Sequence, residues 1–161
     1  MPRTRALAGV ALGWRPELAA DVLRAPESVD FLEVVADSCF AQPSAWREAR
    51  AIAEVKPVVP HGVKLSLGSA DGVEMERAKR LGALARELGA PAITEHVALT
   101  RGGGRDIGHL TPLPFTREAV RVVARCSAAN LRDFQSSLWQ MIRPAAPAVV
   151  MLPVSGIRSP E

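Results

Sequence analysis

Tyrosine is absent from this chain of 161 residues, and aromatic residues make up only 4% of it. A protein that binds nucleic acid by stacking on its bases needs several exposed aromatic rings, so the composition argues against that class. The net charge of +3 at pH 7 does not reverse the argument. Arginines are mixed with glutamates in stretches such as VEMERAKRLGALAREL, a pattern typical of a solvated helix face. We therefore expect no nucleic-acid partner.

Cysteines and long apolar runs are also scarce. Cys39 and Cys126 are the only cysteines, and their wide separation argues against both a disulfide framework and a thiolate metal site. No apolar run approaches the roughly 20 residues of a membrane span, and the N-terminal MPRTRALAG lacks the apolar core of a secretory signal. These absences predict a cytoplasmic protein with no membrane partner.

What the chain does have is a regular alternation of apolar runs and amphipathic stretches. The pattern predicts an α/β fold of about four to five βα units, with parallel strands and the helices outside. No GxGxxG or GxxxxGK[ST] motif follows the first strand, which argues against nucleotide binding. Ser44 is a candidate N-cap, and residues 100–116 are interpreted as a flexible glycine-rich loop. Strands are expected within residues 7–13, 29–36, 56–65 and 90–99, and helices within 15–24, 43–55, 73–88 and 116–126.

All three histidines and two glutamates lie at or beyond the ends of these strands. The carboxyl ends of parallel strands meet at one edge of a sheet, where active sites of α/β folds are assembled. We therefore expect His61 and His96 to point into a common space. Imidazole and carboxylate groups together suit zinc, iron, manganese or nickel. The candidate site residues are Glu33, His61, Glu95, His96 and His109.

Each candidate also has a plainer interpretation. His61 alone could be a hydrogen-bonded histidine at a strand end. Glu95 and His96 are adjacent in a strand and must face opposite sides, so we favour His96 as the ligand and Glu95 as an orienting group. Glu33 stands in an apolar strand and requires a positive or hydrogen-bonding neighbour. The role of His109 stays open: it could be a metal ligand, a substrate contact or an ordinary loop residue.

Five motifs in order, GVALGWRPEL, VDFLEVVAD, PHGVKLSLGSA, ITEHVAL and GHLTPLPFTREAV, resemble the multinuclear non-haem iron-dependent oxidative enzymes, a bacterial TIM-barrel family. The resemblance covers roughly residues 8 to 125. It implies a site of two or three iron ions that activates dioxygen to oxidise cysteines of a ribosomally made precursor peptide, often with a small partner protein. It also implies that His61, His96 and, less directly, His109 bind metal. Glu33 and Glu95 are our candidates for catalytic residues.

The chain departs from this family in length. A complete (β/α)₈ barrel needs about 250 residues, so residues 1–125 are expected to form only the N-terminal half of the barrel domain, with 126–161 a divergent or partly ordered tail. The family's fifth-strand motif LEN is replaced here by APAVVMLPVSG. We therefore expect weak or no activity from the chain alone, and self-association through exposed sheet edges.

Two other functions remain open. One is a divalent-metal barrel of the sugar isomerase or endonuclease type, which also places histidine and glutamate at strand ends. The other is a non-catalytic fragment that acts as a binding module. The resemblance implies an oxidoreductase, whereas the absence of the later ligands leaves the enzymatic activity of this chain open.

Overall fold

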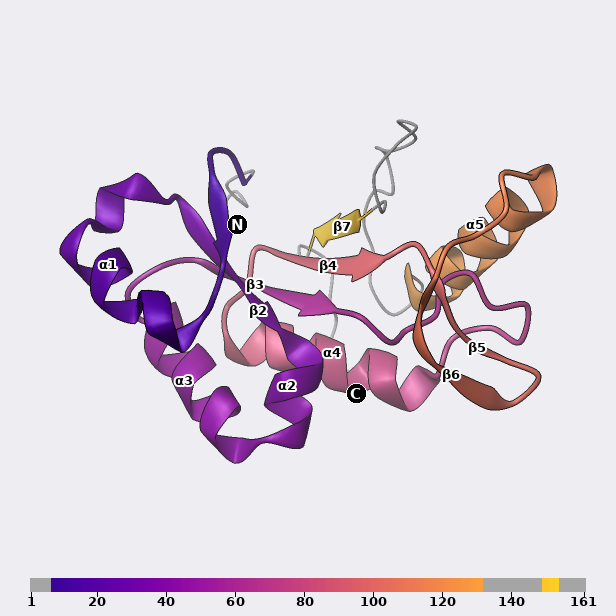
Figure 1. Cartoon of the computed structure of the whole chain (residues 1–161), viewed down its shortest axis with the longest axis horizontal. Coiled ribbons are helices and arrows are strands. Elements are labelled where there is room, and N and C mark those ends of the chain that lie inside the picture. Colours follow the sequence, from indigo (N-terminus) through magenta and orange to yellow (C-terminus); the bar gives the residue numbers. More distant parts are fainter. Residues whose placement is uncertain (1–6, 132–148, 154–161) are drawn as a thin grey trace.

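The computed structural model describes residues 7–131 and 149–153. Its main sheet has the strand order β1-β2-β3-β4-β7, and the first four strands run parallel (Figure 1). Helices connect these parallel strands, which confirms the α/β class and the incomplete TIM-barrel architecture. The strands of this sheet are β1 Ala11–Gly13, β2 Phe31–Val35, β3 Val58–Gly62, β4 Ala92–His96 and β7 Val149–Pro153.

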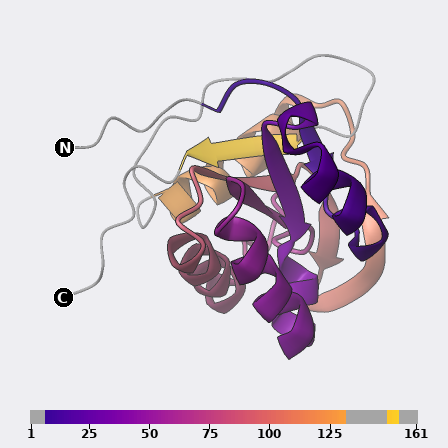
Figure 2. The same cartoon turned by 90° about the vertical axis from the view of Figure 1, so that its left-hand side faces the viewer.

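The helices α2, α3 and α4 lie together on one face of the sheet (Figures 1 and 2). None of the helices in the described ranges is long and apolar enough to cross a bilayer. The helical elements are η1 Pro16–Leu18, α1 Ala19–Arg24, η2 Pro26–Ser28, α2 Ala36–Ala41, α3 Pro43–Ala53, α4 Met75–Glu87 and α5 Arg117–Leu131.

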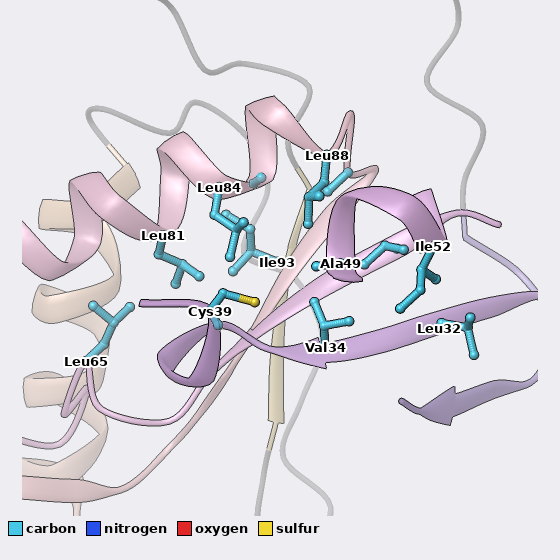
Figure 3. Close-up of a cluster of buried hydrophobic side chains, with 14 of the residues drawn as sticks. Leu32, Val34, Cys39, Ala49, Ile52, Leu65, Leu81, Leu84, Leu88 and Ile93 are labelled. Carbon is cyan, nitrogen blue, oxygen red and sulfur yellow. The ribbon is translucent and has the colours of Figure 1, made fainter. Parts of the chain in front are cut away.

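The apolar core lies between this helix layer and the sheet (Figure 3). Leu81 and Leu84 of α4, with Leu88 at its C-cap, lie on one face and point toward Ile93 of β4. Leu84 and Ile93 are almost completely buried. Burying each such side chain stabilises the fold by about 1.5–3 kcal/mol. The helix-facing side of the sheet is therefore the side that holds the domain together.

The helix from residue 43 begins differently from the prediction. Its N-cap is Gln42, and no side chain caps it by a hydrogen bond, so the prediction that Ser44 is the N-cap is wrong. Pro43 occupies the first helical position, where a missing amide donor costs nothing and the fixed φ favours the helix. The sequence pattern also did not predict α2, a short helix that directly follows β2.

The glycine-rich segment after β4 is a β-hairpin, so its interpretation as a flexible loop is wrong. Its strands are β5, Leu99–Gly102, and β6, Arg105–Thr111, which pair antiparallel. Gly103 and Gly104 form the connection, with φ of 58° and 72°. Two successive residues with positive φ make the tight turn that matches the twist of paired strands, and glycine adopts it without strain.

Most of the segment 126–161 lies outside the described residues. Within the described part, α5 continues past Cys126 to Leu131, and β7 pairs antiparallel with β4. The outer edge of β4 is therefore occupied, and the expectation of an exposed sheet edge is wrong at that strand. At the other edge, β1 pairs with β2 alone among the strands that the structure describes.

Candidate functional site

His61 and His96 lie at the carboxyl ends of the neighbouring strands β3 and β4. Their Nε2 atoms are 2.9 Å apart, and their rings meet edge to face with centroids separated by 4.7 Å. The pairing of β3 with β4 places His61 opposite Thr94, so His96 stands one side-chain repeat further along the same face. The expectation that the two imidazoles share one space is confirmed.

A hydrogen-bonded chain behind His61 fixes the orientation of its ring. The Thr94 hydroxyl donates to the Glu33 carboxylate, so its oxygen accepts from the Nδ1–H of His61 at 2.8 Å. Glu33 Oε1 is also 3.5 Å from the same Nδ1. With its proton on Nδ1, His61 accepts a hydrogen bond at Nε2 from the Nε2–H of His96, and a metal ion bound by both nitrogens would take the place of that proton. Metal-bound histidines are oriented in this way by a partner on the other ring nitrogen.

The separation of the two Nε2 atoms fits a shared metal ion. Histidine nitrogens bind such ions at about 2.0–2.1 Å, so two ligands at right angles around one ion stand about 3 Å apart. Within residues 7–131 and 149–153, no three His, Cys, Asp or Glu side chains form a group that could hold a metal ion. The described residues thus present two matched nitrogen donors, which are fewer than a complete site needs.

The surroundings of His96 favour its neutral form. Burial lowers the pKa of its imidazole below the usual value, and the neighbouring His61 lowers it further, while Glu33 acts in the opposite direction. Neutral imidazole is the form that binds metals, because protonation removes the lone pair.

Glu95 faces the other side of the sheet, toward the helix layer. Its carboxyl group accepts hydrogen bonds from the backbone amides of His96, at 2.9 Å, and Leu65, at 3.3 Å. Burial is the main cause that raises its pKa to about 8, and the two amide hydrogen bonds act against it. The carboxyl group ties the end of β4 to the segment that follows β3. Gly62 leaves room for it, since a Cβ at that position would lie 2.2 Å from Glu95 Oε2.

A second carboxylate holds the same segment from α2. Asp37 Oδ2 accepts a hydrogen bond from the backbone amide of Val63 at 3.1 Å, and Oδ1 pairs with the guanidinium of Arg77. Arg77 and Arg101 both approach Glu74 Oε2, at 3.7 Å and 3.4 Å. The hydrogen bond from Val63 to Asp37, with that from Leu65 to Glu95, fixes the chain directly after His61.

His109 stands apart from the histidine pair. It lies on the exposed strand β6, and the contact that the structure gives its ring is with Thr111 Oγ1, 3.4 Å from Nδ1. Among the described contacts, none joins His109 to His61 or His96. Its role as a metal ligand stays a prediction.

Sequence reasoning assigned no role to three residues of this site. Thr94 precedes His96 by two positions in a strand, so the shared face could have been inferred from the alternation of side chains. Asp37 and Arg77 are 40 residues apart, and no local pattern predicts that they meet.

Comparison with known proteins identifies the family. The profile of the family described as RiPP precursor modification enzyme MbnB/TglH/ChrH matches residues 9–143. The UPF0276 protein of Streptomyces avermitilis is 38% identical over 143 residues, which are 84% of this chain and 28% of that protein. The UPF0276 protein of Rhizorhabdus wittichii is 39% identical over 62% of this chain and 36% of its own length. The UPF0276 protein of Caulobacter vibrioides is 34% identical over 71% of this chain and 42% of its own length.

The chain thus spans less than half the length of these curated relatives. The family match nevertheless takes in all four parallel strands and both histidines of the pair. The chain therefore belongs to the MbnB/TglH/ChrH family of RiPP precursor modification enzymes, the metal-dependent TIM-barrel family that its motifs resemble.

Proposed function

We propose that this chain carries part of the metal site of an iron- and dioxygen-dependent enzyme that oxidises cysteine residues of a RiPP precursor peptide. The observation that supports it is the pair of Nε2 atoms 2.9 Å apart, with the ring of His61 oriented by Thr94 and Glu33. Bound iron would supply the redox chemistry with dioxygen. The family match supports peptide modification as the reaction class.

The proposed roles are metal binding by the histidines and orientation of those histidines by the glutamates. His61 and His96 bind metal through Nε2, and Glu33, acting through Thr94, holds the Nδ1 proton of His61. Glu95 orients the pair from the opposite face, through the amides of His96 and Leu65. His109 is a weaker candidate for a metal ligand or a substrate contact, because it stands on an exposed hairpin strand.

The proposed activity needs more ligands than the described residues supply. Two imidazoles leave most of the coordination sphere of one iron ion open, and a cluster of two or three ions needs several carboxylates as well. We propose that residues 1–125 form the N-terminal half of the barrel domain. By itself the chain should then bind ferrous iron no better than micromolar and should not turn over a cysteine-containing peptide.

The test is an anaerobic titration of the purified chain with ferrous iron, repeated with zinc and manganese. Binding should be lost in His61→Ala and in His96→Ala, whereas His109→Ala should change it little. Equal iron binding by the two strand-end variants and the unchanged chain would refute the proposed ligands. Tight binding of two or more irons with oxygen-dependent peptide oxidation would show that the chain is a complete enzyme.

The same titration separates the remaining functions. A preference for zinc or manganese without any oxygen dependence would favour a hydrolase or isomerase. Absence of binding of all three metals would favour a non-catalytic binding module. A small partner protein, which the family resemblance implies, would be sought by repeating the iron titration in its presence.

A further inference from the structure

The helix α5 has two unlike faces. One face packs toward the core, where Cys126 and Ser127 are buried and Val122 is partly buried. The opposite face is exposed, and its residues recur every three or four positions, as one stripe along a helix does. This stripe consists of Arg117, Val120, Arg121, Ala124 and Arg125, and the exposed Glu118 lies at its edge.

The basic side chains of this stripe outnumber the acidic ones beside it, because Glu118 is the single acidic residue of α5. Residues 99–127 contain five arginines and two acidic residues, a surplus of +3 that equals the net charge of the whole chain. Arg101 of β5 pairs with Glu74. The three stripe arginines, by contrast, form no ion pair within the residues that the structure describes.

Apolar groups accompany these charges. The side chain of Phe115, two residues before α5, is 96% exposed, and Val120 between the first two arginines of the stripe is 54% exposed. An exposed phenylalanine beside arginines is typical of a binding surface, where aromatic and arginine side chains are enriched. We name Phe115 together with the five stripe residues the α5 surface.

The helix α5 and the chain just before it pack against the segment that follows the histidine strand β3. The Cys126 thiol donates to the carbonyl oxygen of Ser69 at 3.4 Å. Leu113 lies so close to Gly68 that a Cβ there would be 2.2 Å from Leu113 Cδ2. In Figure 1 the arrowheads of β3 and β4 point toward the end of the molecule that carries the β5–β6 hairpin and α5. A ligand on this surface would therefore lie at the end of the sheet where the histidines are.

We propose that the α5 surface docks an acidic peptide segment with interspersed apolar residues, as part of the precursor peptide. Successive arginines are one turn apart, about 6 Å along the helix, so glutamates or aspartates of one peptide can meet all three. Val120, Ala124 and Phe115 offer apolar contact between the charges. The identity of the peptide as the substrate rests on the proposed function, whereas the binding itself does not.

An acidic peptide fits this surface better than a nucleic acid does. Phe115 is the only aromatic side chain of the surface, and single-stranded nucleic acids need a series of rings on which to stack. The apolar side chains between the arginines have no counterpart on a phosphate backbone, but they match leucine or valine in a peptide. A single exposed ion pair is weak, so the affinity should come from several such contacts together with Phe115.

The test uses the full chain and a fluorescein-labelled peptide of 20 residues composed of glutamate, leucine, alanine and serine. Control probes are the same peptide with lysine for glutamate and a single-stranded DNA of 20 nucleotides. Changing Arg117, Arg121 and Arg125 to glutamine should weaken binding of the acidic peptide about tenfold at low salt. Phe115→Ala should weaken it a few-fold further, with little dependence on salt.

A matched control changes as many charges elsewhere. The control variant replaces three exposed basic residues of α3 and α4 by glutamine, namely Arg47, Lys79 and Arg86. Its affinity for the acidic peptide should stay within about twofold, because these charges lie outside the α5 surface. Circular dichroism of both variants checks that the helices persist.

Two results would overturn the proposal. One is equal loss of affinity in the control variant and the α5 variant, which would mean that net charge alone governs binding. The other is tighter binding of the DNA than of the acidic peptide by the unchanged chain. Iron binding measured on the α5 variant keeps the two proposals distinct, since loss of peptide binding with normal iron binding concerns this surface alone.

Discussion

The two faces of the parallel sheet carry different chemistry, and their glutamates show the contrast. Glu33 lies on the face opposite the helix layer, which we call the inner face, where it is hydrogen-bonded to Thr94 and stands beside His61. Glu95, on the helix-covered face, is 1% exposed and bonded to backbone amides, with its pKa raised to about 8. The inner face positions the nitrogens proposed to bind metal, and the helix-covered face fixes the backbone that carries them. Stability and function should therefore respond to different substitutions.

The largest loss of stability is expected on the helix-covered face. Leu84→Ala removes a fully buried side chain from the core and should lower the free energy of unfolding by about 2–5 kcal/mol, because the cavity cannot close completely. Urea denaturation measures the change. His61→Ala, on the inner face, should cost much less stability while it abolishes metal binding. If His61→Ala is as destabilising as Leu84→Ala, the division between the faces fails.

The next effect is the pH dependence that Glu95 contributes. Its pKa is raised from 4.5 in the reference state to about 8 in the fold. Between these values the unfolded chain loses a proton that the folded chain retains, so stability falls as pH rises from about 4.5 to about 8. Glu95→Gln, which resembles the protonated form, should remove this slope.

Denaturation of the metal-free chain and of Glu95→Gln at several pH values measures it. The stability advantage of the variant should grow from pH 5 to pH 8. Parallel curves for the two proteins would show that Glu95 is already ionised in the fold. Glu33→Gln, which alters the other glutamate, serves as the comparison on the inner face.

A smaller effect is expected from Thr94, which acts on the metal through His61. Thr94→Val removes the hydroxyl that bridges Glu33 and His61 and should weaken metal affinity about 10- to 100-fold. Competition with a coloured metal chelator measures the affinity. Thr94→Ser keeps a hydroxyl and should restore most of it. Unchanged affinity in Thr94→Val would mean that the ring of His61 needs no such support.

The smallest effect is expected at His109. His109→Ala removes an exposed imidazole whose described contact is the 3.4 Å approach to Thr111. Stability should change by less than about 0.5 kcal/mol, and metal affinity by less than about twofold. A large loss of metal binding, with normal circular dichroism, would place His109 among the ligands.

Several features of this protein could be predicted from the sequence because their causes are local. The apolar runs around β2, β3 and β4 and the amphipathic pattern of α4 reflect side-chain periods that any short segment displays. The order of strands and helices then predicts parallel pairing, which brings His61 and His96 to one edge. Alternation along β4 separates His96 from Glu95.

The features that the sequence did not reveal depend on contacts between distant segments. The hairpin in residues 99–111 was obscured because its glycines are equally typical of a flexible loop, and only strand pairing distinguishes the two. The pairing of β7 with β4 also joins segments far apart in the chain.

The sequence by itself determined the α/β class, the family motifs and the positions of His61 and His96 at strand ends, since each depends on residue types and their spacing. Only the tertiary structure decided that Thr94 and Glu33 orient His61, and that Asp37 and Glu95 hold the chain after it. Those partners meet because parallel strands and the helices between them bring residues 26 to 61 positions apart within hydrogen-bonding distance. No pattern within one segment records such a meeting.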